Sequence, residues 1–104
     1  MTACSPATEA QIAESISQTP WQVRDGVLCR TVVAPSFAGV IELVNAIAAL
    51  SQRRDHHPEM IISGCRLTMT LTTHDAAAIT QLDLAMVPQI DAIVDEFLRV
   101  PLST

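Results

Sequence analysis

The sequence predicts an α+β fold, in which a four-stranded antiparallel sheet carries three helices packed on one face in the order α-β-β-α-β-β-α. Two pairs of short strand-like segments, each joined by a turn, indicate two hairpins. Three stretches with apolar residues at helical spacing precede, separate and follow these hairpins. The chain has 104 residues, 49% of them hydrophobic, which suits one domain over residues 1–104 with one core.

The first helix is predicted to begin at Ser5 and Pro6, because serine is a favoured N-cap and proline suits the first helical turn. It continues to about Ser17, and the Thr19-Pro20 pair ends it. The apolar residues that give the helical spacing are Ala10, Ile12, Ala13 and Ile16.

The first hairpin is predicted to have strands at residues 21–24 and 27–34. Asp25 and Gly26 between them are a strong two-residue turn signal, because both central positions of a type I′ turn need φ > 0. Pro35 then stops the second strand.

The middle helix is predicted from Phe37 to about Arg54, with Ser36 as its N-cap. Pro58 prevents the helix from continuing further. One apolar stripe is expected to face the core, and it consists of Phe37, Val40, Ile41, Val44, Ile47 and Ala48.

The second hairpin is predicted to have a short strand at residues 59–63, a bend at Gly64 and a longer strand at residues 65–73. Apolar and polar residues alternate in the longer strand, so one of its faces is buried and the other is polar. The apolar positions are Leu67, Met69 and Leu71, and the polar positions are Arg66, Thr68, Thr70 and Thr72.

The last helix is predicted to begin near Thr80, because Thr80-Gln81-Leu82-Asp83 resembles a capping box. Pro88 predicts a kink or a late start, and Pro101 ends the helix. The expected core face consists of Leu82, Met86, Val87, Ile90, Ile93, Val94 and Phe97.

The charge of the chain excludes one class of partner and indicates another. With 6 Lys+Arg and a formal net charge of −5, the chain has too little positive charge to neutralise many phosphates, so we expect no direct nucleic-acid binding. Charged residues make up only 16%, below the usual quarter, which indicates that part of the surface is covered by another subunit.

The remaining composition favours a cytoplasmic protein. Cys4, Cys29 and Cys65 show no CxxC spacing, so reduced thiols are expected rather than a disulfide framework. Residues 1–10 show no signal-peptide pattern. The longest mostly apolar run, residues 40–50, is too short to span a bilayer, so no membrane association is expected.

All three histidines of the chain bracket the second predicted hairpin. His56 and His57 follow the middle helix in Asp55-His56-His57-Pro58-Glu59, and His74 follows the last strand. Because the two strands between them pair antiparallel, His74 is expected to return beside His56 and His57. Imidazoles exchange protons near neutral pH, so the three predict an acid/base site. The alternatives are helix C-capping by the pair and a solvent-exposed loop position for His74.

Other chemistries fit the sequence less well. A metal site could combine the histidines with Asp55, Glu59 or Asp83, but adjacent histidine side chains diverge, and HxH and HxxxH pairs are absent from the sequence. Asp83 also has a structural interpretation as a helix-capping partner. The sequence has no GxSxG motif, and its 3 glycines do not suit a phosphate-binding loop. We therefore expect no metal and no cofactor.

The histidine motif resembles that of the pterin-4a-carbinolamine dehydratases. The resemblance rests on His56-His57-Pro58-Glu59, on Leu71-Thr72-Thr73-His74 and on Ile79-Thr80-Gln81-Leu82-Asp83. Trp21 after a short helix and Arg30 in the second strand agree with it. The resemblance covers nearly the whole chain, from about Ala7 to Phe97.

The resemblance implies a cofactor-free hydro-lyase that dehydrates 4a-hydroxytetrahydrobiopterin to the quinonoid dihydropterin, in tetrahydrobiopterin recycling. It implies proton transfer by His57 and His74, with His56 placing or polarising the hydroxyl. Members of the family form homodimers or homotetramers. The residues expected to bind the pterin substrate are Asp55, Pro58, Glu59, Thr73 and Asp83.

The sequence also departs from the family pattern around the histidines. Family members usually have an acidic residue where Gln52 stands, and an aromatic residue at the position of Gly64 and often at that of Met60. A glycine is common at the position of Ala78. These departures leave a second hypothesis open, a non-catalytic interaction module of the transcriptional-coactivator or Rubisco-assembly-chaperone type.

Overall fold

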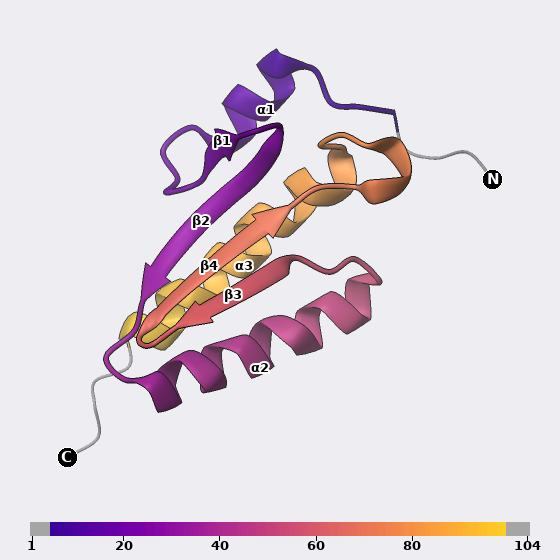
Figure 1. Cartoon of the computed structure of the whole chain (residues 1–104). Coiled ribbons are helices and arrows are strands. Elements are labelled where there is room, and N and C mark those ends of the chain that lie inside the picture. Colours follow the sequence, from indigo (N-terminus) through magenta and orange to yellow (C-terminus); the bar gives the residue numbers. More distant parts are fainter. Residues whose placement is uncertain (1–4, 100–104) are drawn as a thin grey trace.

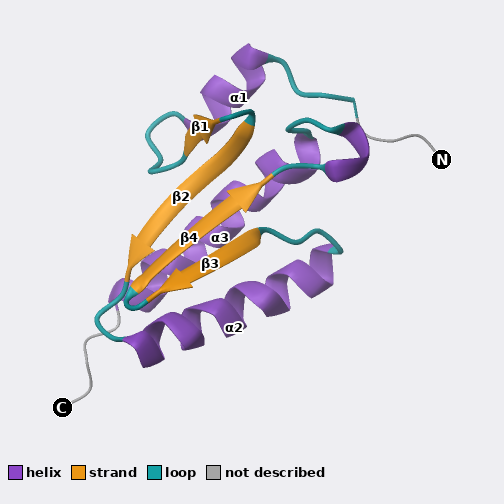
Figure 2. Ribbon diagram, in the orientation of Figure 1, coloured by secondary structure: helices purple, strands orange, loops and turns teal. Residues whose placement is uncertain are grey.

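The computed structural model describes residues 5–99 and confirms the predicted order of elements (Figures 1 and 2). The sheet is antiparallel throughout, with the spatial order β1-β2-β4-β3. A 3₁₀ turn, η1, lies between the last strand and the last helix. The elements are α1 (Glu9–Ile16), β1 (Gln22–Arg24), β2 (Val27–Val33), α2 (Phe37–Arg54), β3 (Glu59–Ser63), β4 (Arg66–Leu71), η1 (His74–Ala76) and α3 (Gln81–Arg99).

The core lies between the helices and one face of the sheet. The register pairs Leu28 with Leu71 and Val32 with Leu67, and all four side chains are buried. The alternate residues of these strands face away from the helices, and Thr31 among them is exposed. The predicted alternation in β4 is therefore confirmed, and the second face of the sheet is left open and rich in threonine.

The first helix begins later than predicted, because a better cap lies downstream. Thr8 is the N-cap of α1, and its hydroxyl accepts from the Gln11 backbone N–H at 3.0 Å. The Gln11 side chain accepts from the Thr8 N–H at 2.8 Å, which completes a capping box. The predicted start at Ser5 and Pro6 is wrong, and Pro6 instead forms an isolated bridge with Thr80.

The predicted turn between the first two strands is confirmed. Asp25 and Gly26 have φ values of 50° and 79°, which is the left-handed conformation that a type I′ turn requires at both central positions. Arg24 pairs with Val27 directly across this turn. The hairpin therefore sets the register of β2, which in turn pairs with β4.

The second helix has the predicted bounds and N-cap, and its predicted core face is confirmed in part, because Val40 and Ile47 are buried. Ser36 accepts from the Gly39 N–H at 3.0 Å. Phe37 and Ile41, which were expected in the core, are 57% and 36% exposed. Apolar residues surround most of this helix, so spacing alone could not choose between its faces. The buried residues are Val40, Leu43, Ile47, Leu50 and Ser51.

The last helix starts at Gln81 and continues through Pro88, so the late start suggested by that proline is wrong. Proline removes the backbone donor that would otherwise reach the Leu84 carbonyl. Leu82, which was expected on the core face, is 43% exposed, whereas Asp83 is buried. The predicted stop at Pro101 lies outside the described residues.

A polar cluster ties β2 and the start of the first hairpin to α3. The carboxylate of Asp91 on α3 accepts from the guanidinium of Arg30 and from the Trp21 indole N–H, the latter at 2.8 Å. Arg30 is only 8% exposed, so its charge needs this partner. Trp21, the one tryptophan of the chain, is buried.

Two further expectations concern cysteines and membranes. Cys29 is partly buried, Cys65 is exposed, and both are free thiols. Cys4 lies outside the described residues. Among residues 5–99, the helices are all too short or too polar to cross a bilayer.

Candidate active site

The end of α2 places the two adjacent histidines. Asp55 caps the helix in the left-handed conformation, with φ 53° and ψ 42°, a conformation that aspartate tolerates better than most residues. The backbone N–H of His56 then returns to the Ser51 carbonyl at 3.1 Å. This tight reversal brings His56 and His57 to the end of the sheet where β3 begins.

The loop after β4 places the third histidine. Thr73 and Ala78 exchange two backbone hydrogen bonds, at 3.0 and 3.4 Å, and so close the loop between them. Ala77 completes the closure in the left-handed conformation with φ 53°. His74 begins the 3₁₀ turn inside this loop, and Figure 1 shows the loop at the same end of the sheet as the end of α2.

Two adjoining cavities meet at these histidines. The first, of about 300 Å³, lies between the α2–β3 connection and the loop after β4; the second, of about 260 Å³, lies on the open face of the sheet. His57, Thr72 and His74 line both. The first cavity is lined by Asp55, His56, His57, Thr72, Thr73, His74, Asp75 and Leu82. The second is lined by Val27, His57, Glu59, Thr70, Thr72 and His74.

A buried carboxylate holds His56. One oxygen of Asp83 lies 2.6 Å from His56 Nε2. The other oxygen accepts from the Thr73 hydroxyl at 2.8 Å and from the Thr80 backbone N–H at 2.9 Å. Asp83 is 0% exposed, so these three protein donors replace the water that would otherwise solvate it. Because a carboxylate only accepts, His56 carries its hydrogen on Nε2.

The hydroxyls behind Asp83 form a chain with one direction. Thr73 donates to Asp83, so its oxygen must accept from the Thr80 hydroxyl, 2.7 Å away. The Thr80 oxygen in turn accepts from the Leu82 backbone N–H at 3.2 Å. The predicted resemblance to a capping box is therefore confirmed in part: Asp83 reaches back to the Thr80 N–H, while the Thr80 hydroxyl caps one residue earlier than usual.

His57 and Glu59 have partners that face solvent. His57 Nε2 lies 3.3 Å from the side-chain oxygen of Gln52, which is on the last turn of α2. Glu59 accepts from the Thr70 hydroxyl across the β3–β4 ladder at 3.4 Å. His57, Glu59 and His74 are all exposed, so a small molecule can reach them.

Comparison with known proteins identifies the family. Residues 5–93 match the family model described as pterin 4 alpha carbinolamine dehydratase. The chain belongs to this family. A Chloroflexus aurantiacus protein provisionally named pterin-4-alpha-carbinolamine dehydratase is 36% identical over 88 residues, which are 84% of this chain and 95% of that protein. A Mycobacterium protein with the same provisional name is 41% identical over 75 residues, 72% of this chain and 80% of that protein.

Two solved structures resemble this chain in fold. A structure titled transcriptional coactivator/pterin dehydratase, from Brucella melitensis, has a TM-score of 0.81 at 27% identity and covers 86% of this chain and 99% of that chain. A pterin dehydratase-like protein described as a RuBisCO assembly factor of the alpha-carboxysome has a TM-score of 0.59 at 21% identity, covering 71% and 86%. The second likeness shows the fold alone.

Of the five residues that the dehydratase resemblance implies for substrate binding, three line the two cavities and two do not. Asp55 and Thr73 line the first cavity, and Glu59 lines the second. Pro58 is buried and Asp83 is fully buried, and neither is among the residues that line these cavities. Asp83 reaches the site through its contact with His56.

Several lining residues were not predicted from the sequence. Thr70 and Thr72 could have been found, because they alternate with the buried Leu71 and so face the open side of the sheet. Leu82 was assigned to the core by helical spacing. Val27 comes from the other hairpin, and its place in the site depends on the β2–β4 pairing.

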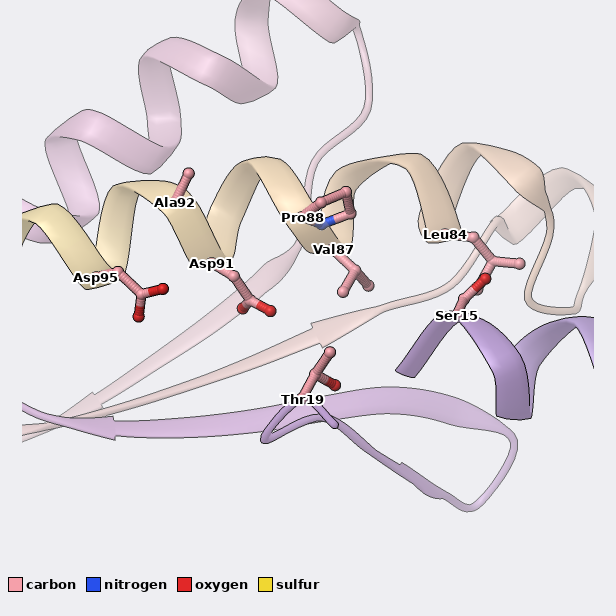
Figure 3. Close-up of a pocket in the computed structure, with 8 residues that line it drawn as sticks. All are labelled: Ser15, Thr19, Leu84, Val87, Pro88, Asp91, Ala92 and Asp95. Carbon is pink, nitrogen blue, oxygen red and sulfur yellow. The ribbon is translucent and has the colours of Figure 1, made fainter. Parts of the chain in front are cut away.

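A larger groove lies away from the histidines. It lies between α1 and α3, has a volume of about 440 Å³, and is lined by residues that include Asp91, Pro88 and Thr19 (Figure 3). The carboxylate of Asp91 is already bonded to Arg30 and Trp21. As for metals, residues 5–99 contain no group of three or more His, Cys, Asp or Glu side chains placed to hold an ion.

Proposed function

We propose that the protein dehydrates 4a-hydroxytetrahydrobiopterin to the quinonoid dihydropterin by histidine acid/base catalysis, as a step of tetrahydrobiopterin recycling. One observation carries the proposal: His56, His57 and His74 gather around two adjoining cavities in a chain of the dehydratase family. We also propose a cytoplasmic location, which the free thiols of Cys29 and Cys65 support.

The proposed reaction needs two proton transfers, and His57 and His74 are our candidates for them. The C4a–O bond breaks and the oxygen leaves as water after receiving a proton, while the N5–H proton is removed by a base. His57 and His74 line both cavities, so one substrate can contact both imidazoles. His56 is held by Asp83 and lines the first cavity, where it orients the hydroxyl.

The two cavities together bind the pterin in this proposal. Asp55 and Thr73 contact the part of the substrate in the first cavity, and the Glu59 carboxylate accepts from N–H groups of the ring in the second. The Thr70 and Thr72 hydroxyls lie beside Glu59 on the same open face. Pro58 and Asp83 shape the site without lining it.

The direct test is a dehydration assay with synthetic 4a-hydroxytetrahydrobiopterin. We expect the purified protein to raise the rate well above that in buffer, because positioned acid/base groups typically contribute about 10²- to 10⁴-fold. Free imidazole at three times the protein concentration is the control for unpositioned histidine. A folded protein, verified by circular dichroism, that gives no more rate than this control would rule out the enzyme.

We further propose that the protein is a homo-oligomer that associates through β3. This strand is an edge of the sheet, with one side unpaired. It carries Ile61 at 55% and Ile62 at 39% exposure, and its sequence, Glu59–Ser63, has no lysine or proline to block edge pairing. A second copy would cover both isoleucines, which agrees with the low charge content of the chain.

Replacing Ile61 by lysine is expected to shift the protein toward the monomer. Two copies related by a two-fold axis bring their lysines together, so we expect the association constant to fall by about tenfold or more. Light scattering after size-exclusion chromatography measures the mass. Val23→Lys is the matched control, since Val23 is 48% exposed on β1 at the opposite edge. A monomeric wild-type protein, or an equal shift in both variants, would contradict association through β3.

The second candidate is a non-catalytic interaction module of the coactivator or Rubisco-assembly type. Phe37 and Ile41 favour it, because they expose apolar surface on α2 at the end of the helix opposite the histidines. The dehydration assay separates the two candidates. A module of this kind would show no rate above the imidazole control, and its partner binding would be lost in a Phe37→Ser variant that keeps all three histidines.

A further inference from the structure

We propose that Gln52 is a positioning residue, which holds His57 in the tautomer with its hydrogen on Nε2 and so makes Nδ1 the atom that accepts the proton. The catalytic part of this proposal rests on the proposed dehydratase function. The tautomer itself does not, because it is a property of the free protein that can be measured without substrate.

The geometry that supports this proposal lies at the end of α2. Gln52 is on the last turn of the helix, and the left-handed Asp55 reverses the chain so that His57 returns toward it. The Gln52 side-chain oxygen and His57 Nε2 are 3.3 Å apart. An amide oxygen can only accept a hydrogen bond, so the ring nitrogen in this contact must donate.

The tautomer of His57 follows from the number of N–H groups on its ring. A neutral imidazole carries a single N–H, so a hydrogen on Nε2 leaves Nδ1 with the lone pair. His56 is held in the same way, since its Nε2 lies 2.6 Å from the Asp83 carboxylate. Both neighbouring histidines therefore use Nε2 for a protein partner and have the lone pair on Nδ1.

Asp83 and Gln52 differ in charge, so His56 and His57 have different electrostatic environments. Asp83 places a buried carboxylate beside His56, whereas Gln52 places a neutral, exposed amide beside His57. An amide fixes the orientation and tautomer of a ring without adding a negative charge next to it. Gln52 can thus position the His57 ring through a neutral group.

The test reads the tautomer from the ¹⁵N shifts of the histidine rings at about pH 9, where imidazoles are neutral. The His57 signals are assigned by their loss in His57→Ala. We expect wild-type His57 to show a protonated Nε2 and a lone-pair Nδ1. Gln52→Leu is expected to give a mixture of tautomers, and Gln52→Glu to restore the wild-type pattern because a carboxylate oxygen also accepts. Gln22→Leu, the same change on exposed β1, should leave the spectrum unchanged.

Kinetics provide the second measurement. We expect Gln52→Leu to lower kcat by about threefold to tenfold, the effect of losing one neutral hydrogen bond, with KM little changed. Gln52→Glu should recover most of this loss. A His57 that carries its hydrogen on Nδ1 in the wild-type protein, or an identical spectrum in Gln52→Leu, would overturn the proposal. If the spectra behave as expected but the wild-type protein has no dehydratase activity, the positioning of His57 stands and the proposed function falls.

Discussion

Replacing Asp83 by alanine is expected to lower the melting temperature by about 12 to 24 °C and to remove most of the dehydration activity. Three donors lose their acceptor at once: the His56 ring, the Thr73 hydroxyl and the Thr80 backbone N–H. Leaving buried donors unpaired at such a site costs about 3 kcal/mol. In a domain of this size each kcal/mol corresponds to roughly 4–8 °C. Thermal unfolding by circular dichroism and the dehydration assay measure the two effects.

The control for this substitution is Asp95→Ala, which removes an exposed aspartate from the same helix. We expect it to change stability by less than about 0.5 kcal/mol. Asp83→Asn adds a second comparison, because it keeps the volume but turns one acceptor into a donor that faces other donors. Melting temperatures for Asp83→Ala and Asp83→Asn that match that of Asp95→Ala would show that the buried contacts of Asp83 do not stabilise the fold.

Replacing His57 or His74 by alanine is expected to lower kcat by about 10²- to 10⁴-fold each, the range for a positioned acid or base. Both side chains are exposed, so their removal leaves no cavity and the melting temperature should hardly move. This separates them from Asp83, whose loss is expected to affect folding as well as rate. Steady-state kinetics and thermal unfolding on the same preparations distinguish the two patterns.

The matched control for the histidine variants is Arg53→Ala, an exposed position on the last turn of α2. It should retain wild-type kcat and KM. Unchanged rates in both His57→Ala and His74→Ala would remove these residues from the mechanism, even if the protein dehydrates its substrate. A loss in only one of them would reduce the site to a single proton-transfer group.

The positions of the three histidines could be expected from the sequence because antiparallel pairing is a strong geometric rule. Leu67, Met69 and Leu71 fixed the buried face of β4, and the end of that strand had to return to the start of β3. Thr70 and Thr72 follow by the same alternation. The alternation of buried and exposed residues in β4 therefore predicted which residues lie near the histidines.

Which helix residues are buried could not be predicted fully, because burial depends on contacts that a periodic pattern does not encode. Phe37 and Ile41 match the helical spacing of a core face but are exposed. Leu43 and Leu50, on a neighbouring stripe, are buried together with Val40 and Ile47 of the predicted stripe. Leu82 is exposed and Asp83 is buried in its place. The Asp83 carboxylate faces inward because it accepts from His56, Thr73 and the Thr80 N–H. A buried polar side chain is chosen by its partners, which are visible only in three dimensions.

The site is built almost entirely from one uninterrupted part of the chain. From Gln52 to Asp83 lie all three histidines and their hydrogen-bond partners, and Val27 is the one contribution from earlier residues to the lining of the two cavities described. Contacts so close in sequence can form early in folding. Exposed positions on the earlier elements, such as Phe37 and Ile41 on α2, do not line these two cavities. A lineage with this layout can acquire new binding partners on those elements while its chemistry stays intact.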